Sequence, residues 1–117
     1  MKPTVFAGAN NGMTIAREEI FGPVGTIIAF DTEEEAVAIA NDSDYGLAAT
    51  LWTNDLTRAH RVAHQVKVGA VGVNCWSPLD ANLPWGGLKS SGIGREGGIT
   101  GALAYTEEKV ITVLLPS

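Results

Sequence analysis

The stretch VGTIIAFDTEEEAVAIA, residues 24–40, carries the clearest fold signal in the sequence. Residues 24–30 form a short and almost continuously apolar run, which predicts a strand covered on both faces. Thr32 then begins a Thr-Glu-Glu-Glu sequence in which Glu35 stands at the capping-box position. The apolar stripe that follows predicts a helix that ends at the turn-prone residues 41–44. A strand followed directly by a capped helix is typical of an α/β fold.

The same alternation continues along the chain. Residues 46–52 predict a second buried strand, and Asp55 or Thr53 can cap a helix whose apolar positions recur until Gly69 ends it. Residues 70–74 predict a third strand. We therefore expect right-handed crossovers and an α/β fold with a mainly parallel sheet and flanking helices.

The C-terminal third departs from this alternation. Residues 75–95 show no periodicity and predict a long irregular segment, a feature that in compact domains is usually functional. A short helix is expected near residues 98–105 and a β-prone strand over 109–115. That terminal strand would form an apolar edge unless another strand pairs with it.

Composition limits the classes of function. A chain of 117 residues suffices for one domain and can bury roughly two-thirds of its unfolded surface. Thirteen acidic against eight basic residues give a net charge of −5, so we expect neither nucleic acid nor a membrane surface as a partner. No apolar run approaches the ~20 residues of a membrane span, and no secretory signal follows Met1, so we expect a cytoplasmic protein.

Two segments contain residues suited to binding. REEIFGPV, residues 17–24, places a carboxylate on a Gly-Pro turn, where it could accept hydrogen bonds from a diol such as a ribose. Phe21 could pack against a flat ring, although a solvated glutamate pair with Phe21 in the core is the commoner outcome. LPWGGLKSSGIGRE, residues 83–96, matches neither the Walker spacing nor the dinucleotide fingerprint, so a structural loop is favoured over an anion cradle.

The single cysteine and the two histidines give weaker signals. Cys75 excludes an internal disulfide and a cysteine metal cluster, and a buried or wall-lining thiol is favoured over a nucleophile in a hydrolase. His60 and His64 have the spacing of a metal pair but lack the glutamate of the H-E-x-x-H motif. We expect them on a polar helix face and predict no metal site.

Seven ordered segments together resemble the NAD(P)-dependent aldehyde dehydrogenase superfamily. They are REEIFGPV (17–24), NDSDYGLAA (41–49), WTNDL (52–56), RAHRV (58–62), VNCW (73–76), PWGGLKSSGIGRE (84–96) and YTE (105–107). The resemblance covers essentially the whole chain and corresponds to the C-terminal portion of enzymes several hundred residues long. It implies a partial aldehyde dehydrogenase catalytic domain.

The resemblance also implies roles for individual residues. Glu19 would hydrogen-bond the nicotinamide-ribose hydroxyls, and Phe21 would pack near the nicotinamide end of the cofactor. Cys75, Leu79 and Trp85 would line the aldehyde tunnel, with Cys75 on its wall and not as the nucleophile. Trp85 stands where members commonly carry Phe, which would narrow the tunnel. The loop at 79–84 is most similar to members that oxidise arylacetaldehydes.

The family reaction oxidises an aldehyde to a carboxylic acid through a thiohemiacetal, with NAD or NADP as the cofactor. Residues 1–105 would belong to the catalytic domain and 106–117 to an oligomerisation strand that pairs with a neighbouring subunit. The Rossmann-like domain, the Gly-Gln-x-Cys nucleophile and the Glu-Leu-Gly-Gly general base are not among the 117 residues. We therefore expect no catalytic residue, no turnover and no tight cofactor binding by this chain alone. The alternative is a docking module that forms a homo-oligomer or pairs with another aldehyde dehydrogenase chain.

Overall fold

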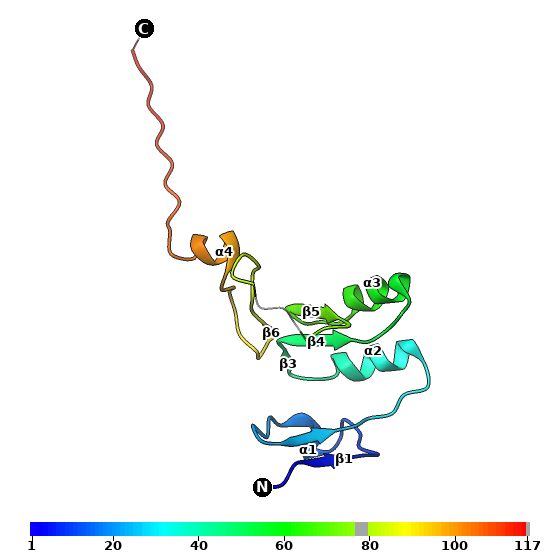
Figure 1. Ribbon diagram of the computed structural model, residues 1–117. Helices are drawn as coiled ribbons and strands as arrows, with labels where there is room; N and C mark the ends of the chain where they lie inside the picture. The colour runs from blue at the N-terminus through cyan, green and yellow to red at the C-terminus, as the bar shows by residue number, and fades with distance from the viewer. Residues whose placement is uncertain (77–79, 117) are drawn as a thin grey trace.

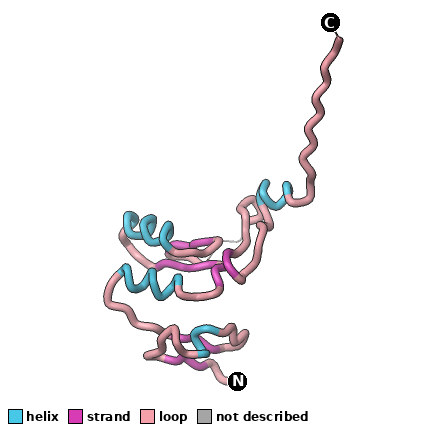
Figure 2. Tube along the Cα trace, turned by 180° about the vertical axis from the view of Figure 1, so that it is seen from behind, coloured by secondary structure: helices cyan, strands magenta, loops and turns pink. Residues whose placement is uncertain are grey.

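A computed structural model describes residues 1–76 and 80–116. Its elements, in chain order, are β1 (Thr4–Phe6), α1 (Thr14–Arg17), β2 (Val24–Thr26), α2 (Glu33–Asn41), β3 (Tyr45–Gly46), β4 (Ala48–Leu51), α3 (Leu56–Gln65), β5 (Ala70–Val73), β6 (Leu88–Lys89) and α4 (Gly98–Leu103). Figures 1 and 2 show the β1–β2 unit at one end, the two longer helices with β4 and β5 in the middle, and α4 with the C-terminal tail at the other end.

The strands of the described residues pair in three separate two-stranded sheets. β1 and β2 are parallel, and so are β4 and β5, in which Ala48 lies opposite Ala70. β3 and β6 are antiparallel, with Tyr45 opposite Lys89. The predicted α/β class with parallel strands is confirmed, but within the described residues the parallel pairs do not join into one continuous sheet.

The two longer helices begin where their caps predict. Thr32 Oγ1 accepts a hydrogen bond of 3.1 Å from the Glu35 N–H, and Glu35 closes the motif by accepting from the Asp31 N–H at 2.8 Å. Asp55 caps α3 by accepting from the Arg58 N–H at 3.0 Å. These local bonds satisfy N–H groups that have no partner within the helix.

The C-terminal limit of α3 differs from the prediction. The helix ends at Gln65 and not at Gly69, because Val66 already has an extended backbone. Gly69 instead attaches the segment before β5 to β3 and the adjoining residue, because its N–H donates to the carbonyls of Gly46 and Leu47 at 3.0 and 3.1 Å. A Cβ on Gly69 would overlap the Gly86 carbonyl, so glycine here permits two backbone segments to cross closely.

The predicted strand ends also need correction. The strand expected over 24–30 is limited to β2, because the chain leaves β1 after the Ile27 N–H donates to the Phe6 carbonyl at 2.8 Å. The strand expected over 46–52 is divided at Leu47 between β3 and β4. β1, α1 and β6 were not predicted, since short elements leave little periodicity in the sequence.

The terminal strand predicted over 109–115 does not form within the single chain. The described residues 106–116 contain no helix or strand, and Figure 1 shows them extending away from the body. Their large apolar side chains are exposed, with Val110 at 90% and Leu114 at 92%. A strand needs a neighbouring backbone for its hydrogen bonds, and this segment has none within reach in the described chain.

The chain buries much less surface than its length predicts. Its radius of gyration is 19.8 Å, whereas a compact domain of this length has about 13 Å. Its accessible surface is 9358 Å², against roughly 6100 Å² for a compact protein of this mass, so about half and not two-thirds of the unfolded surface is buried. Among the described residues, the buried hydrophobic side chains are Ala59 and Val66. No helix of the described chain is long and apolar enough to cross a membrane.

Candidate functional site

The turn that follows α1 presents Glu19 and Phe21 to solvent. Glu18 closes α1 through its N–H, and Phe21 has a positive φ of 48°, an uncommon conformation for a bulky residue. The Val24 N–H donates to the Gly22 carbonyl at 2.7 Å and stabilises the turn before β2. Phe21 is 92% exposed, so the alternative prediction, that Phe21 packs in the core, is wrong for this chain. Glu19 is also exposed and has no hydrogen-bond partner among the described residues.

The Gly-rich segment is held by its own backbone and by its cations. Trp85 and Glu96 exchange two backbone hydrogen bonds of 2.7 Å each, and Trp85 is half-buried. Arg95 Nη1 donates to the carbonyls of Gly87 and Gly94 at 2.8 and 2.7 Å. Because Arg95 is bound to protein carbonyls, the arrangement supports a structural loop and not an anion cradle.

Asn74 joins the carboxyl ends of β4 and β5. Its Oδ1 accepts from the Thr53 N–H at 2.9 Å, and its Nδ2 donates to the Thr53 carbonyl at 2.8 Å. Its positive φ of 54° is a conformation that asparagine tolerates. Cys75, the next residue, is consequently placed just beyond β5 and is exposed, so of the two expected alternatives the buried thiol is wrong for this chain, whereas the wall-lining thiol stays a prediction.

The remaining candidate residues lie apart from these segments. Leu79 lies outside the described residues. His60 and His64 are exposed on α3, and the described chain contains no group of three or more side chains that could hold a metal ion. A role for Cys75, Leu79 and Trp85 in one tunnel stays a prediction.

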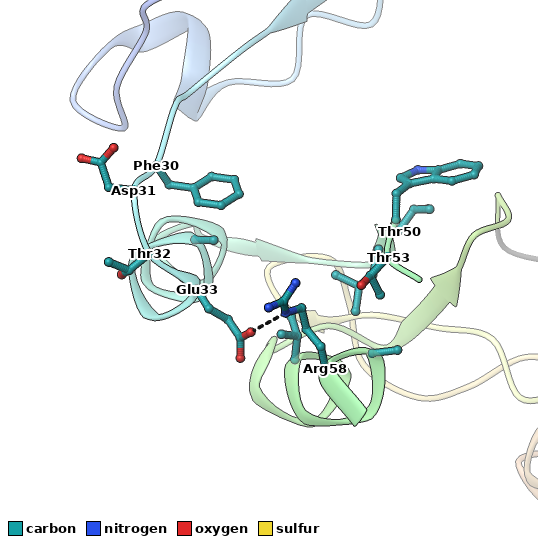
Figure 3. Close-up of a pocket in the computed structure, with 12 residues that line it drawn as sticks. Phe30, Asp31, Thr32, Glu33, Thr50, Thr53 and Arg58 are labelled. Carbon is teal, nitrogen blue, oxygen red and sulfur yellow. Dashed lines mark hydrogen bonds and ion pairs between the residues drawn. The ribbon is translucent and has the colours of Figure 1, made fainter. Parts of the chain in front are cut away.

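A pocket of about 550 Å³ opens between the start of α2, the end of β4 and the first turns of α3. Sequence reasoning did not identify it. Figure 3 shows the Phe30 ring on the α2 side and the Glu33 carboxylate joined to Arg58 across the floor. Its lining residues are Phe30, Asp31, Thr32, Glu33, Ala36, Thr50, Leu51, Trp52, Thr53, Arg58, Ala59 and Val62. Neither Glu19 nor Trp85 is among them.

Glu33 links the two helices beneath this pocket. Its carboxylate accepts from Arg61 Nε at 2.6 Å and from Arg58 Nε at 3.1 Å. The hydrogen bond from Arg61 is the main cause that lowers the pKa of Glu33, and the same carboxylate raises the pKa of Arg61. The two arginines lie 25 and 28 positions from Glu33, so the sequence pattern did not predict this contact.

Comparisons with known proteins agree on one family. The sequence model of the aldehyde dehydrogenase family matches residues 1–111. A Mycobacterium tuberculosis aldehyde dehydrogenase in complex with NAD+ shares 54% identity, with a TM-score of 0.89 over 97% of this chain and 23% of that chain.

Two further solved structures are similar. The betaine aldehyde dehydrogenase of Staphylococcus aureus in complex with NAD+ shares 48% identity, with a TM-score of 0.87 over 89% of this chain and 21% of that chain. The indole-3-acetaldehyde dehydrogenase AldA of P. syringae, a variant in complex with NAD+ and IAA, shares 50% identity, with a TM-score of 0.86 over 90% of this chain and 21% of that chain. The chain therefore spans less than a quarter of the length of these relatives.

Proposed function

This chain belongs to the aldehyde dehydrogenase family, and we propose that it supplies the ribose-binding turn and part of the substrate wall of an NAD-dependent aldehyde dehydrogenase. The observation that carries the proposal is the exposed turn at 18–23, which presents an unpaired carboxylate and an exposed aromatic ring next to each other. NAD, when bound, would supply the acceptor for the hydride of the aldehyde.

The two side chains of this turn fit the part of the cofactor that they would hold. An ionised carboxylate offers two acceptor oxygens, so Glu19 can accept from both hydroxyls of a vicinal diol. The Phe21 ring, with 92% of its surface exposed, offers an apolar face that would exclude water from one side of a flat ring. Both contacts orient a ligand and do not themselves move a proton or a hydride.

We propose further that these 117 residues act only within a larger body, whether the rest belongs to the same chain or to another. The exposed surface exceeds that of a compact protein of equal mass by roughly 3300 Å², several times the ~800 Å² that one partner buries in a standard interface. Such an excess supports a catalytic domain that is completed by further polypeptide. The isolated chain would then neither bind NAD tightly nor turn over aldehydes.

A docking role is the second candidate, and the terminal segment favours it. Residues 106–116 are extended, and their exposed apolar side chains have free backbone groups beside them. An extended segment of this kind can add a strand to the open sheet edge of a second copy or of another aldehyde dehydrogenase chain. Static light scattering tests this role, because a strictly monomeric chain at micromolar concentration would contradict it.

The substrate that we propose is an arylacetaldehyde. The loop at 79–84 suggested this class, and the solved relatives include an indole-3-acetaldehyde dehydrogenase. A betaine aldehyde dehydrogenase has comparable identity, so similarity alone does not select between aromatic and cationic aldehydes. The half-buried indole of Trp85 supports the aromatic class, since ring stacking favours a flat substrate.

NADH formation with phenylacetaldehyde and with betaine aldehyde tests the proposal directly. The chain alone should give no signal, and turnover that disappears in Cys75→Ala would contradict the proposed role. When a family polypeptide carrying the nucleophile and cofactor domain is added, NADH should form, with phenylacetaldehyde preferred. Glu19→Gln should then raise the KM for NAD, whereas the neighbouring Glu18→Gln serves as the matched control and should leave it unchanged.

A further inference from the structure

The side-chain hydrogen bonds that leave the N-terminal unit, residues 1–30, reach the rest of the described chain at one place. Asn11 Nδ2 donates to the Ile39 carbonyl at 2.9 Å and to Asp42 Oδ2 at 3.1 Å. Arg17 donates through Nη1 to the Asp42 carbonyl and through Nη2 to Asp42 Oδ2, both at 2.8 Å. Within the described residues, every side-chain hydrogen bond that leaves this unit ends at Ile39 or Asp42.

This attachment lies next to the ribose-binding turn. Arg17 is the last residue of α1, two positions before Glu19, and its Nε also donates to the Asn11 carbonyl. The guanidinium therefore connects both ends of the 11–17 segment to the carbonyl and the carboxylate of Asp42, the C-cap residue of α2. The C-terminal end of a helix carries partial negative charge on its free carbonyls, which a cation at this position complements.

Two other segments reach the same end of α2. Lys89 Nζ donates to the carbonyls of Asn41 and Ser43 at 2.9 and 2.8 Å, so the Gly-rich segment that carries Trp85 is attached here. The Asn41 side chain accepts from the Lys67 N–H at 2.7 Å and donates to the Gln65 carbonyl at 2.9 Å, which attaches the end of α3. Residues 39–43 thus form a junction of three segments that are distant in sequence.

We infer that this junction positions the Glu19–Phe21 turn relative to the segment that carries Trp85, with Asp42 as the central positioning residue. Arg17 and Asn11 bind Asp42 from one side, and Lys89 binds the adjacent carbonyls from another. Any shift of α2 would therefore move both proposed contact regions together. That the two regions contact a cofactor and an aldehyde rests on the proposed function, whereas the junction between them does not.

A network is required for this role, because an isolated exposed ion pair contributes little. Arg17 and Asp42 are both partly exposed, yet the Asp42 carboxylate and carbonyl together accept four hydrogen bonds from two side chains, the longest being the 3.3 Å bond from Asn11. The backbone of residues 27–32 also leads from the unit into α2, and Phe30 lines the pocket beside α2; Figures 1 and 2 show the β1–β2 unit on one side of the central helices.

Hydrogen exchange measured by mass spectrometry on the full chain tests the inference. In Asp42→Ala, peptides covering residues 15–26 should exchange about two- to fivefold faster, because the unit opens more often once the carboxylate that accepts from Asn11 and Arg17 is lost. Asp42→Asn keeps a side-chain oxygen in place and should restore much of the protection. Arg17→Ala and Asp42→Ala share the loss of the bond from Arg17 Nη2 to the Asp42 carboxylate, so the double change should accelerate exchange by less than the product of the two single effects.

Glu33→Gln supplies the matched control, because it weakens another exposed ion pair on α2 that does not contact the N-terminal unit. It should leave peptides 15–26 unchanged. Unaltered exchange in Asp42→Ala, equal acceleration in Glu33→Gln, or additive effects of the two alanine changes would overturn the inference. NAD does not enter this measurement, so a failure of Glu19 to affect the KM for NAD would contradict the proposed function and leave the junction intact.

Discussion

Replacement of Gly69 by alanine is a sharp test of how the Gly-rich segment is packed. Gly69 lies between α3 and β5, where the backbone of Gly86 crosses it. A Cβ at position 69 would overlap the Gly86 carbonyl oxygen and would also lie 3.2 Å from the Gly87 Cα. Since the obstacle is backbone and not the tip of a flexible side chain, no rotamer change can relieve it.

The loss of stability in Gly69→Ala can be worked out from the displacement of the Gly86 carbonyl. To reach ordinary van der Waals contact, the Gly86 carbonyl would have to retreat by roughly 1.8 Å. That shift would disturb the 2.8 Å bond from Arg95 to the Gly87 carbonyl and the backbone pair between Trp85 and Glu96. One or two weakened hydrogen bonds together with overpacking strain should lower the free energy of unfolding by about 2–4 kcal/mol.

Equilibrium unfolding in urea, followed by tryptophan fluorescence, measures this loss. With a slope of about 1–2 kcal/mol per molar urea, the midpoint of Gly69→Ala should fall by about 1–4 M. Gly25→Ala is the matched control, because nothing lies within 4 Å of its added Cβ, and it should match or slightly exceed the wild-type stability. Midpoints that agree between the two variants would refute the proposed crossing of the two backbones.

Three further predictions concern the helices and the terminal segment. Thr32→Ala removes the acceptor for the Glu35 N–H and should cost about 1 kcal/mol in thermal unfolding, whereas Thr32→Ser should retain most of the stability. The hydrogen bond from Arg61 lowers the pKa of Glu33 in the folded chain below its ordinary 4.5. The ionised Glu33 therefore stabilises the folded state fully above pH 4.5, and this contribution is lost as the pH falls through the pKa of Glu33 in the folded chain. Circular dichroism in acid should therefore show a weaker pH dependence for Glu33→Gln, and an unchanged profile would argue against the ion pair. Val113→Lys should reduce self-association in light scattering if the terminal segment docks as a strand, with the exposed Lys109→Ala as a control that should not.

The elements that the sequence predicted best are those with local causes. Thr32 and Asp55 cap their helices through bonds that span three residues, so a short stretch of sequence contains all the information. The strand at 70–74 was also correct to within one residue, whereas the strands at 24–30 and 46–52 were too long. A strand ends where the paired strand diverges from it, and the sequence of one strand does not show where its partner lies.

The candidate site shows the same division. The order of motifs, together with the residue types of the turn at 18–23 and of the Gly-rich segment, identified the family from sequence alone, and the matches to the family and its solved structures confirm it. The exposure of Phe21 and Cys75 could not be derived in this way. Burial depends on how much neighbouring surface the fold brings to a side chain, and this fold covers little of its own.

The sequence by itself determined the family and the two capped helices. Only the tertiary structure decided that Asn11, Arg17 and Lys89 converge on one end of α2, and that the pocket lies beside Glu33 and away from the ribose-binding turn. The physical reason is the separation along the sequence of the groups that interact. Caps and turns are set by neighbours along the chain, whereas the junction joins donors and acceptors separated by 24 to 48 positions, which only the folded backbone brings within hydrogen-bond distance.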